Sequence, residues 1–134
     1  MNYIDVAVGL ITRNDQVFLT RRKEHQHQGN KWEFPGGKIE KGELPIAGLA
    51  RELAEEVDIK VNSAQQVDLI EHDYGDKCVR LFVFEVANFS GEPRGAEGQQ
   101  STWVKISQLQ DYPLPEANQA MVDWLQSCLK KSGS

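Results

Sequence analysis

Residues 37–59 of the chain read GKIEKGELPIAGLARELAEEVDI, and this stretch decides how the rest of the sequence is interpreted. The hydrophobic residues take a helical period over residues 45–57. Pro45 suits the first helical position, because its missing N–H would have no partner there. At about 100° per residue, five apolar residues fall on one side of this helix: Ile46, Leu49, Ala50, Leu53 and Val57. The pattern predicts an amphipathic helix whose apolar stripe packs against the rest of the fold.

A second face of the same helix carries Glu52, Glu55 and Glu56, roughly opposite the apolar stripe. Residues three and four positions apart are neighbours on a helix surface, so these carboxylates crowd and repel one another. Clustered carboxylate oxygens suit a hard cation such as Mg²⁺, which keeps several waters for substrate phosphates. Taken alone, the E-x-x-E-E pattern is also typical of a solvated acidic helix face.

Apolar runs bounded by turn residues predict strands on both sides of this helix. The expected strands are residues 3–12, 16–22, 67–71, 79–87 and 101–106, with a second amphipathic helix at residues 119–129. A short extended piece at residues 32–37 is expected to run into a turn at its two glycines, and residues 23–31 and 88–100 are expected to be loops. Mixed strands and two separate helices predict an α/β fold, in which helices cover both faces of one sheet.

The composition fits one domain over residues 1–134, with 40% hydrophobic and 26% charged residues. The formal net charge of −5, from 20 acidic and 15 basic residues, gives no general attraction for polyanions. We therefore expect no polymeric nucleic acid as a partner. A small phosphate-rich ligand remains compatible with this charge if a divalent cation bridges the two sets of negative charge.

The expected location is a reducing cytoplasm. Cys78 and Cys128 lie far apart and form no C-x-x-C pair, which argues against a disulfide framework. No apolar run reaches the roughly 18 residues that a membrane span needs. Residues 1–12 also lack the basic and apolar regions of a signal peptide. We expect no membrane partner and a monomer that acts on a small molecule.

The spacing that begins at Gly37 resembles the Nudix box, G-x₅-E-x₇-R-E-U-x-E-E-x-G-U, in which U is aliphatic. The matching residues are Gly37, Glu43, Arg51, Glu52, Leu53, Glu55, Glu56 and Ile59. Asp58 stands where the family has glycine, just beyond the helix end, where a left-handed residue is favoured. Asp tolerates that conformation better than most residues do. Leu44 replaces a capping Thr of many relatives, a loss of about 1 kcal/mol that leaves the chemistry untouched.

The resemblance extends to the MutT-type subgroup of the Nudix hydrolases over nearly the whole chain. It is carried by residues 6–11, 32–40, 91–93, 97–99, 103 and 117–118. It implies an α/β/α sandwich with a mixed central sheet. It also implies hydrolysis of oxidised guanine nucleotides, chiefly 8-oxo-dGTP, to a monophosphate and pyrophosphate. Such an activity clears the nucleotide pool of mutagenic precursors and so protects DNA replication.

The same resemblance implies a set of metal ligands, formed by the Gly36 carbonyl and by Glu52, Glu55, Glu56 and Glu97. The expected metal is Mg²⁺, with Mn²⁺ as the alternative, because carboxylate ligands do not separate the two. Glu52 is the first candidate for the base that receives the proton of the attacking water, and Glu97 is the second. Without the family, Glu97 would be an ordinary exposed loop acid.

Glu43 and Arg51 are two helical turns apart, on roughly the same side, which predicts an ion pair that supports the site.

Four residues are candidates for contact with the substrate: Arg22, His27, Phe34 and Asn118. Arg22 belongs to a basic run at a strand end, where a solvated strand edge is the equal alternative to a phosphate contact. For His27 a surface histidine is the simpler interpretation, and contact with phosphate or a lid is the alternative. By resemblance Asn118 faces the base, where its amide offers a donor and an acceptor to the purine edge; its alternative role is a helix cap.

Two other functions remain open. The box determines the phosphate chemistry but not the base, so the substrate could be another nucleotide, such as a pyrimidine triphosphate or a dinucleoside polyphosphate. A binding module that has kept the fold and lost catalysis is the second alternative. The intact set of Glu52, Glu55 and Glu56 argues against it.

Overall fold

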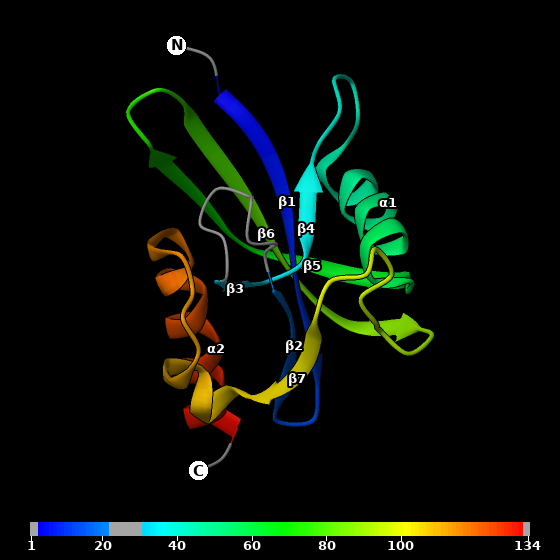
Figure 1. Ribbon diagram of the computed structural model, residues 1–134, viewed down its shortest axis with the longest axis vertical. Helices are drawn as coiled ribbons and strands as arrows, with labels where there is room; N and C mark the ends of the chain where they lie inside the picture. Colours follow the sequence, from blue (N-terminus) through cyan, green and yellow to red (C-terminus); the bar gives the residue numbers. More distant parts are fainter. Residues whose placement is uncertain (1–2, 22–30, 133–134) are drawn as a thin grey trace.

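Strand β1 is the centre of a seven-stranded mixed sheet in the computed structural model, which describes residues 3–21 and 31–132 (Figure 1). The strands are β1 (Tyr3–Arg13), β2 (Gln16–Arg21), β3 (Trp32–Glu33), β4 (Gly36–Lys38), β5 (Lys60–Asp73), β6 (Cys78–Ser90) and β7 (Ser101–Lys105). β1 is parallel to β6 along one edge and antiparallel to β2 and β4 along the other. β5 pairs with β6, and β3 and β7 both pair with β2.

Two helices cover opposite faces of the sheet, α1 (Pro45–Val57) and α2 (Gln119–Ser132) (Figure 1). Successive side chains of a strand point to opposite faces. Ala7 and Ile11 of β1 therefore share one core with α1, whereas Val8 and Leu10 share a second core with α2. Two short 3₁₀ helices, η1 (Ile106–Asp111) and η2 (Glu116–Asn118), lead from β7 into α2. The expected α/β/α sandwich with a mixed central sheet is confirmed.

Helix α1 has the predicted bounds, and the backbone geometry at its two ends accounts for them. Leu44 caps the N-terminus without a side-chain hydrogen bond, and Pro45 follows it. Asp58 adopts the left-handed conformation predicted for the family's glycine, with φ 60° and ψ 40°, and its N–H donates to the Leu53 carbonyl. The buried stripe is narrower than predicted, because Ile46 is 39% exposed.

Long-range pairing changes three predicted elements. Gly36 and Gly37 do not form a turn but lie in β4, opposite Val8 and Ala7 of β1. β6 continues to Ser90, and β5 begins already at Lys60. The start of β5 was not predicted, because it belongs to an edge strand with three register shifts, which interrupt the alternation of apolar and polar residues.

Three further expectations concern substrate contacts, a membrane span and a disulfide. Arg22 and His27 lie outside the described residues. Within the described part of the chain, no helix is long and apolar enough to cross a membrane. Cys78 and Cys128 are not joined by a disulfide.

Candidate active site

Strand β4 brings the acidic face of α1 next to the glycines of the predicted site. A Cβ atom at position 37 would overlap the Glu52 carboxylate, so Gly37 makes room for that side chain. The N–H of Gly36 donates to Oε2 of Glu56 at 3.2 Å. The carboxylates of Glu52 and Glu56 thus lie directly against the backbone of β4.

Arg51 is the centre of a network of acidic side chains. Its Nε and Nη2 each donate to one Glu43 carboxylate oxygen at 3.0 Å, which is the ion pair expected from the sequence. Its Nη1 donates to Oε1 of Glu52 at 2.9 Å and lies 3.8 Å from Oε2 of Glu55. The hydrogen bonds from Arg51 lower the pKa of Glu43 to about 2, and those same bonds raise the pKa of Arg51 above its ordinary value. A two-pronged bond of this kind fixes orientation as well as charge.

Glu56 is a largely buried acid of the site whose charged form is disfavoured. Burial raises its pKa to about 8, and the negative charges of Glu33, Glu97 and Glu52 act in the same direction. The hydrogen bond from Gly36 opposes this shift without cancelling it. A cation bound beside a buried carboxyl that faces other acids stabilises the charged form of that carboxyl. The positive charge offsets burial and the repulsion from the other acids, both of which favour the protonated form.

The oxygen donors of this region fit a hard divalent cation. As the side chains stand, no three His, Cys, Asp or Glu within residues 3–21 and 31–132 are gathered closely enough to hold an ion. Arg51 accounts for part of this, since it engages Glu52 and attracts Glu55.

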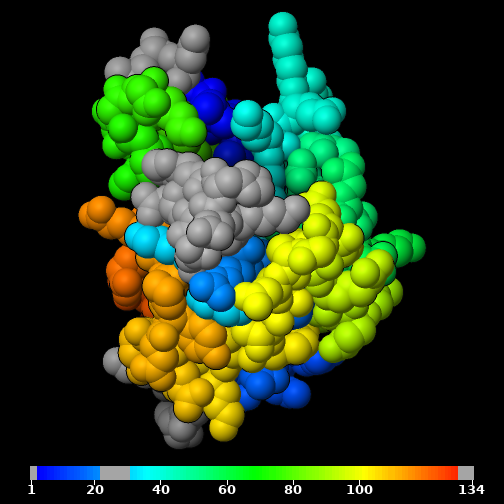
Figure 2. Space-filling view, viewed as in Figure 1, coloured from blue at the N-terminus to red at the C-terminus, as the bar shows by residue number. Residues whose placement is uncertain are grey.

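Glu97 lies in the segment between β6 and β7, at residues 91–100, beside the C-terminal end of α1 (yellow in Figures 1 and 2). Its charge reaches Glu56, whose pKa it helps to raise. The structure thus brings an exposed loop acid to the helix acids, from which it is separated by more than forty positions of sequence.

A pocket of about 450 Å³ opens on the opposite side of β4 and contains three of the predicted residues. Phe34, Gly36 and Asn118 all line it, together with apolar side chains such as Val8, Leu81 and Met121 from the sheet and α2. An apolar hollow with a few polar groups at its edge is typical of small-molecule sites. Gly36 and Gly37 belong both to this pocket and to the acid site, so the two are adjacent.

Two further residues of the pocket were not found from the sequence. Tyr74 and Lys77 come from the turn between β5 and β6, and both residues line the pocket. The Tyr74 N–H donates to the Lys77 carbonyl at 2.9 Å, which closes this turn, and the Tyr74 ring packs edge-on against His72. Their sequence predicts only a turn, because the pairing of β5 with β6 alone determines what that turn faces.

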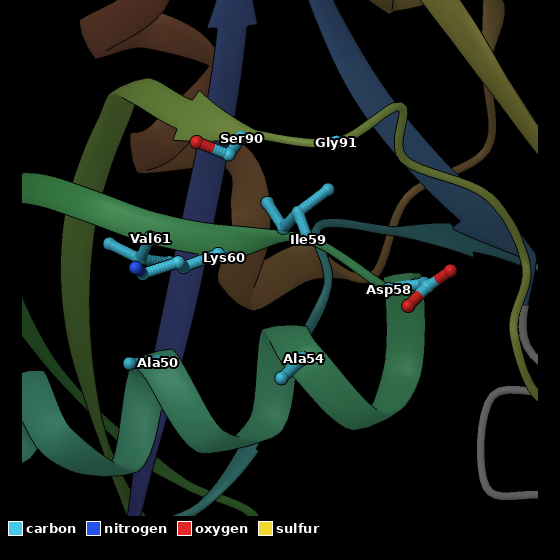
Figure 3. A pocket seen from close by; sticks show the side chains of 8 residues that line it. All are labelled: Ala50, Ala54, Asp58, Ile59, Lys60, Val61, Ser90 and Gly91. Atoms are coloured by element: carbon cyan, nitrogen blue, oxygen red, sulfur yellow. The ribbon is translucent and has the colours of Figure 1, made fainter.

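A larger hollow of about 610 Å³ lies elsewhere, between α1, the start of β5 and the end of β6 (Figure 3). It is shallow and lined by small side chains such as Ala50, Ala54 and Ser90. Its acid, Asp58, is paired with Arg94, whose Nε donates to it at 3.1 Å. Because size alone does not supply convergent functional groups, we place the candidate site in the smaller pocket and at the acids beside it.

The chain belongs to the Nudix family. The family model described as NUDIX domain matches residues 6–124, which include the whole acid site and the pocket.

Individual relatives extend the comparison. The 8-oxo-dGTP diphosphatase of Escherichia coli (strain K12) is 38% identical over 91% of this chain and 95% of its own length. The CTP pyrophosphohydrolase of the same organism is 30% identical over 88% of this chain and 87% of its own length. Among solved structures, one from a study of MutT of Aliivibrio salmonicida and Vibrio cholerae superimposes with a TM-score of 0.84 at 37% identity. That match covers 92% of this chain and 97% of the other.

Proposed function

We propose that this protein hydrolyses 8-oxo-dGTP and related oxidised guanine nucleotides to the monophosphate and pyrophosphate, with a divalent cation as cofactor. One observation carries the proposal. The glycines of β4 separate an acid site from an apolar pocket by a single strand, so a nucleotide whose base enters the pocket extends its phosphates toward Glu52 and Glu56.

The acids supply the chemistry of the phosphate site. When bound, a divalent cation lowers the pKa of the attacking water and neutralises phosphate charge. Glu52, Glu55, Glu56, Glu97 and the Gly36 carbonyl are the proposed ligands. Glu52 is the proposed acceptor of the water proton, and Glu97 is the alternative. Arg51 holds the Glu52 carboxylate at 2.9 Å and ties it to Glu43, so this network orients the base.

The pocket supplies the choice of base. Phe34 offers a ring and Asn118 an amide, and both line the pocket. Oxidation of guanine turns the N7 acceptor into a donor and adds an oxygen at C8. The carbonyl of the Asn118 amide can accept from that new donor. The name of the 38% identical relative, 8-oxo-dGTP diphosphatase, supports the same substrate. The proposal also places Arg22 and His27 at the substrate.

A pyrimidine triphosphate is the second candidate substrate. The similarity to a CTP pyrophosphohydrolase favours it, although that relative is less similar than the 8-oxo-dGTP diphosphatase. Both substrates use the same acids and differ only in what the pocket must accept. We further propose Mg²⁺ as the physiological metal, and a cytoplasmic monomer that does not bind polymeric nucleic acid, which would clear the nucleotide pool before replication.

A hydrolysis screen tests the proposal. The purified protein would be incubated with Mg²⁺ and with 8-oxo-dGTP, dGTP, CTP or dCTP, and with each again after exhaustive chelation. We expect the highest kcat/KM for 8-oxo-dGTP, pyrophosphate as the second product, and no turnover without metal. A preference for CTP would favour the second candidate, and full activity after chelation would refute metal dependence.

A further inference from the structure

The segment that carries Glu97 runs beside the C-terminal end of α1 (Figure 1), and main-chain hydrogen bonds join the two. The N–H of Ala96 donates to the Glu56 carbonyl at 3.0 Å, and the N–H of Arg94 donates to the Val57 carbonyl at 3.1 Å. The last carbonyls of a helix have no partners inside the helix, so the loop provides them. The acidic end of α1 and the Glu97 loop are therefore one hydrogen-bonded unit.

The side chain of Gln99 adds a link that reaches both acids at once. Its Nε2 donates to the Glu56 carbonyl oxygen at 3.0 Å. Its Oε1 accepts from the Glu97 N–H at 2.9 Å. An amide carries its donor and its acceptor on separate atoms, so one side chain can join two main-chain segments in this way. The link connects the backbones of two residues that are proposed to bind the same cation.

The turn around Glu97 is closed so tightly that Gln99 has little freedom. A Cβ atom at Gly95 would overlap the Gln99 carbonyl and lie 3.3 Å from its Oε1. The N–H of Gly98 also donates to the Gly95 carbonyl at 3.1 Å. The main chain and the side-chain amide of Gln99 therefore both pack within this turn.

Other contacts anchor the outer part of the same segment. Arg94 pairs with Asp58, and Glu92 accepts two hydrogen bonds from Arg13, at 2.7 and 2.9 Å. The Arg13 guanidinium lies over the Trp103 ring, 4.3 Å from its centre. These exposed pairs hold the start of the loop, whereas the Gln99 amide bonds to Glu97 itself.

We infer that Gln99 is a positioning residue, whose amide sets the place of Glu97 relative to the acidic end of α1 and thereby the cation affinity and the rate of hydrolysis. The inference rests on the proposed function, because it takes Glu97 and Glu56 as ligands. Residues that hold metal ligands in place typically account for about 10- to 100-fold in metal affinity or activity.

The test replaces Gln99 with Met, which keeps the length of the side chain and removes both hydrogen bonds. The matched control is Gln100→Met, because the neighbouring Gln100 side chain accepts from Arg21 at 3.0 Å instead. Three quantities would be measured in wild type and both variants. They are amide hydrogen exchange of Glu97 without metal, the Kd for Mn²⁺, and kcat and KM for 8-oxo-dGTP.

For Gln99→Met we expect faster exchange at Glu97, a Kd for Mn²⁺ and a kcat each worse by about 10-fold or more, and a nearly unchanged KM. Gln100→Met should stay within roughly twofold of wild type in all three, as an ordinary surface change does. Gln99→Asn keeps the amide but is one methylene too short for both bonds, so it should reproduce the loss if Gln99→Met folds poorly.

The other outcomes decide against the inference, against the proposed function, or against both. Unchanged exchange at Glu97 would show that the link is not formed. Faster exchange with unchanged Mn²⁺ affinity and kcat would show that the link is only structural. A wild-type protein that binds Mn²⁺ but hydrolyses no nucleotide would refute the proposed function, and the Kd comparison would still decide the role of Gln99. A wild-type protein that binds no Mn²⁺ would overturn both.

Discussion

The carboxylate of Glu52 fills the space in which a side chain at position 37 would stand, so Gly37 and Glu52 fit together as a pair. Gly36 differs from it, because a Cβ atom there would overlap the main-chain carbonyl of Ala7. Glycine is thus needed at neighbouring positions for two different reasons, since one position makes room for a side chain and the other for main chain.

Gly37→Ala should fold and lose activity. The new methyl group displaces only the end of a flexible side chain, so the melting temperature should fall little. The displaced Glu52 should lower kcat by on the order of 10²-fold, the scale of a misplaced catalytic group. Gly36→Ala is the comparison, since it must shift backbone and should lower Tm strongly. Equal Tm losses in the two variants, measured by calorimetry, would contradict this distinction.

Glu52→Gln should keep the fold and lower kcat by about 10²-fold or more, because the change preserves shape and removes the charge that accepts a proton or binds a cation. Glu71→Gln serves as the control, since Glu71 is exposed on β5. The measurement is kcat at saturating Mg²⁺ beside a melting curve. A Glu52→Gln variant with wild-type turnover would remove Glu52 from the mechanism.

Arg51→Ala should reduce both stability and rate. It leaves Glu43 and Glu52 without the guanidinium that binds them at 2.9 to 3.0 Å, and their negative charges then repel each other. Arg80→Ala is a matched control, because Arg80 makes a similar two-bond pair with Asp5 away from the acids. It should affect Tm alone. If both variants keep full kcat, Arg51 does not position the base.

The pair of Glu43 and Arg51 should make stability depend on pH in acid. The pKa of Glu43 falls from its ordinary 4.5 to about 2 on folding. A lowered carboxyl pKa stabilises the folded protein above the unfolded value, and this contribution is lost as the pH falls through the folded value. The free energy of unfolding of wild type should therefore approach that of Glu43→Gln between about pH 4.5 and 2. The free energies of unfolding would be measured by urea unfolding at each pH. A constant difference between wild type and Glu43→Gln over this range would contradict the ion pair.

Asn118→Ala should weaken binding of 8-oxo-dGTP more than it slows turnover at saturation. A side chain that contacts the base does so in the ground state and in the transition state alike, so its loss raises KM. Leaving a buried polar group of the ligand unpaired costs roughly 1–3 kcal/mol. The preference for 8-oxo-dGTP over dGTP in kcat/KM should shrink by the corresponding factor. If that preference is the same in wild type and variant, Asn118 does not read the base.

Local sequence determined helix α1 and the placement of its acidic side chains. The sequence predicted the acidic face of α1, its apolar stripe apart from Ile46, its bounds at residues 45 and 57, and the left-handed Asp58, because side-chain period and end geometry depend on neighbours a few positions away. The pair of Glu43 and Arg51 was predictable for the same reason, since both residues belong to one short segment.

Tertiary structure decided everything that depends on contacts between distant segments. The glycines of β4 became a strand because β1 lies beside them. Tyr74 and Lys77 reached the pocket because β5 pairs with β6. Gln99 met the end of α1 because unpaired helix carbonyls need donors from elsewhere in the fold. Such pairings depend on the packing of the whole chain, so no short stretch of sequence carries a signal for them.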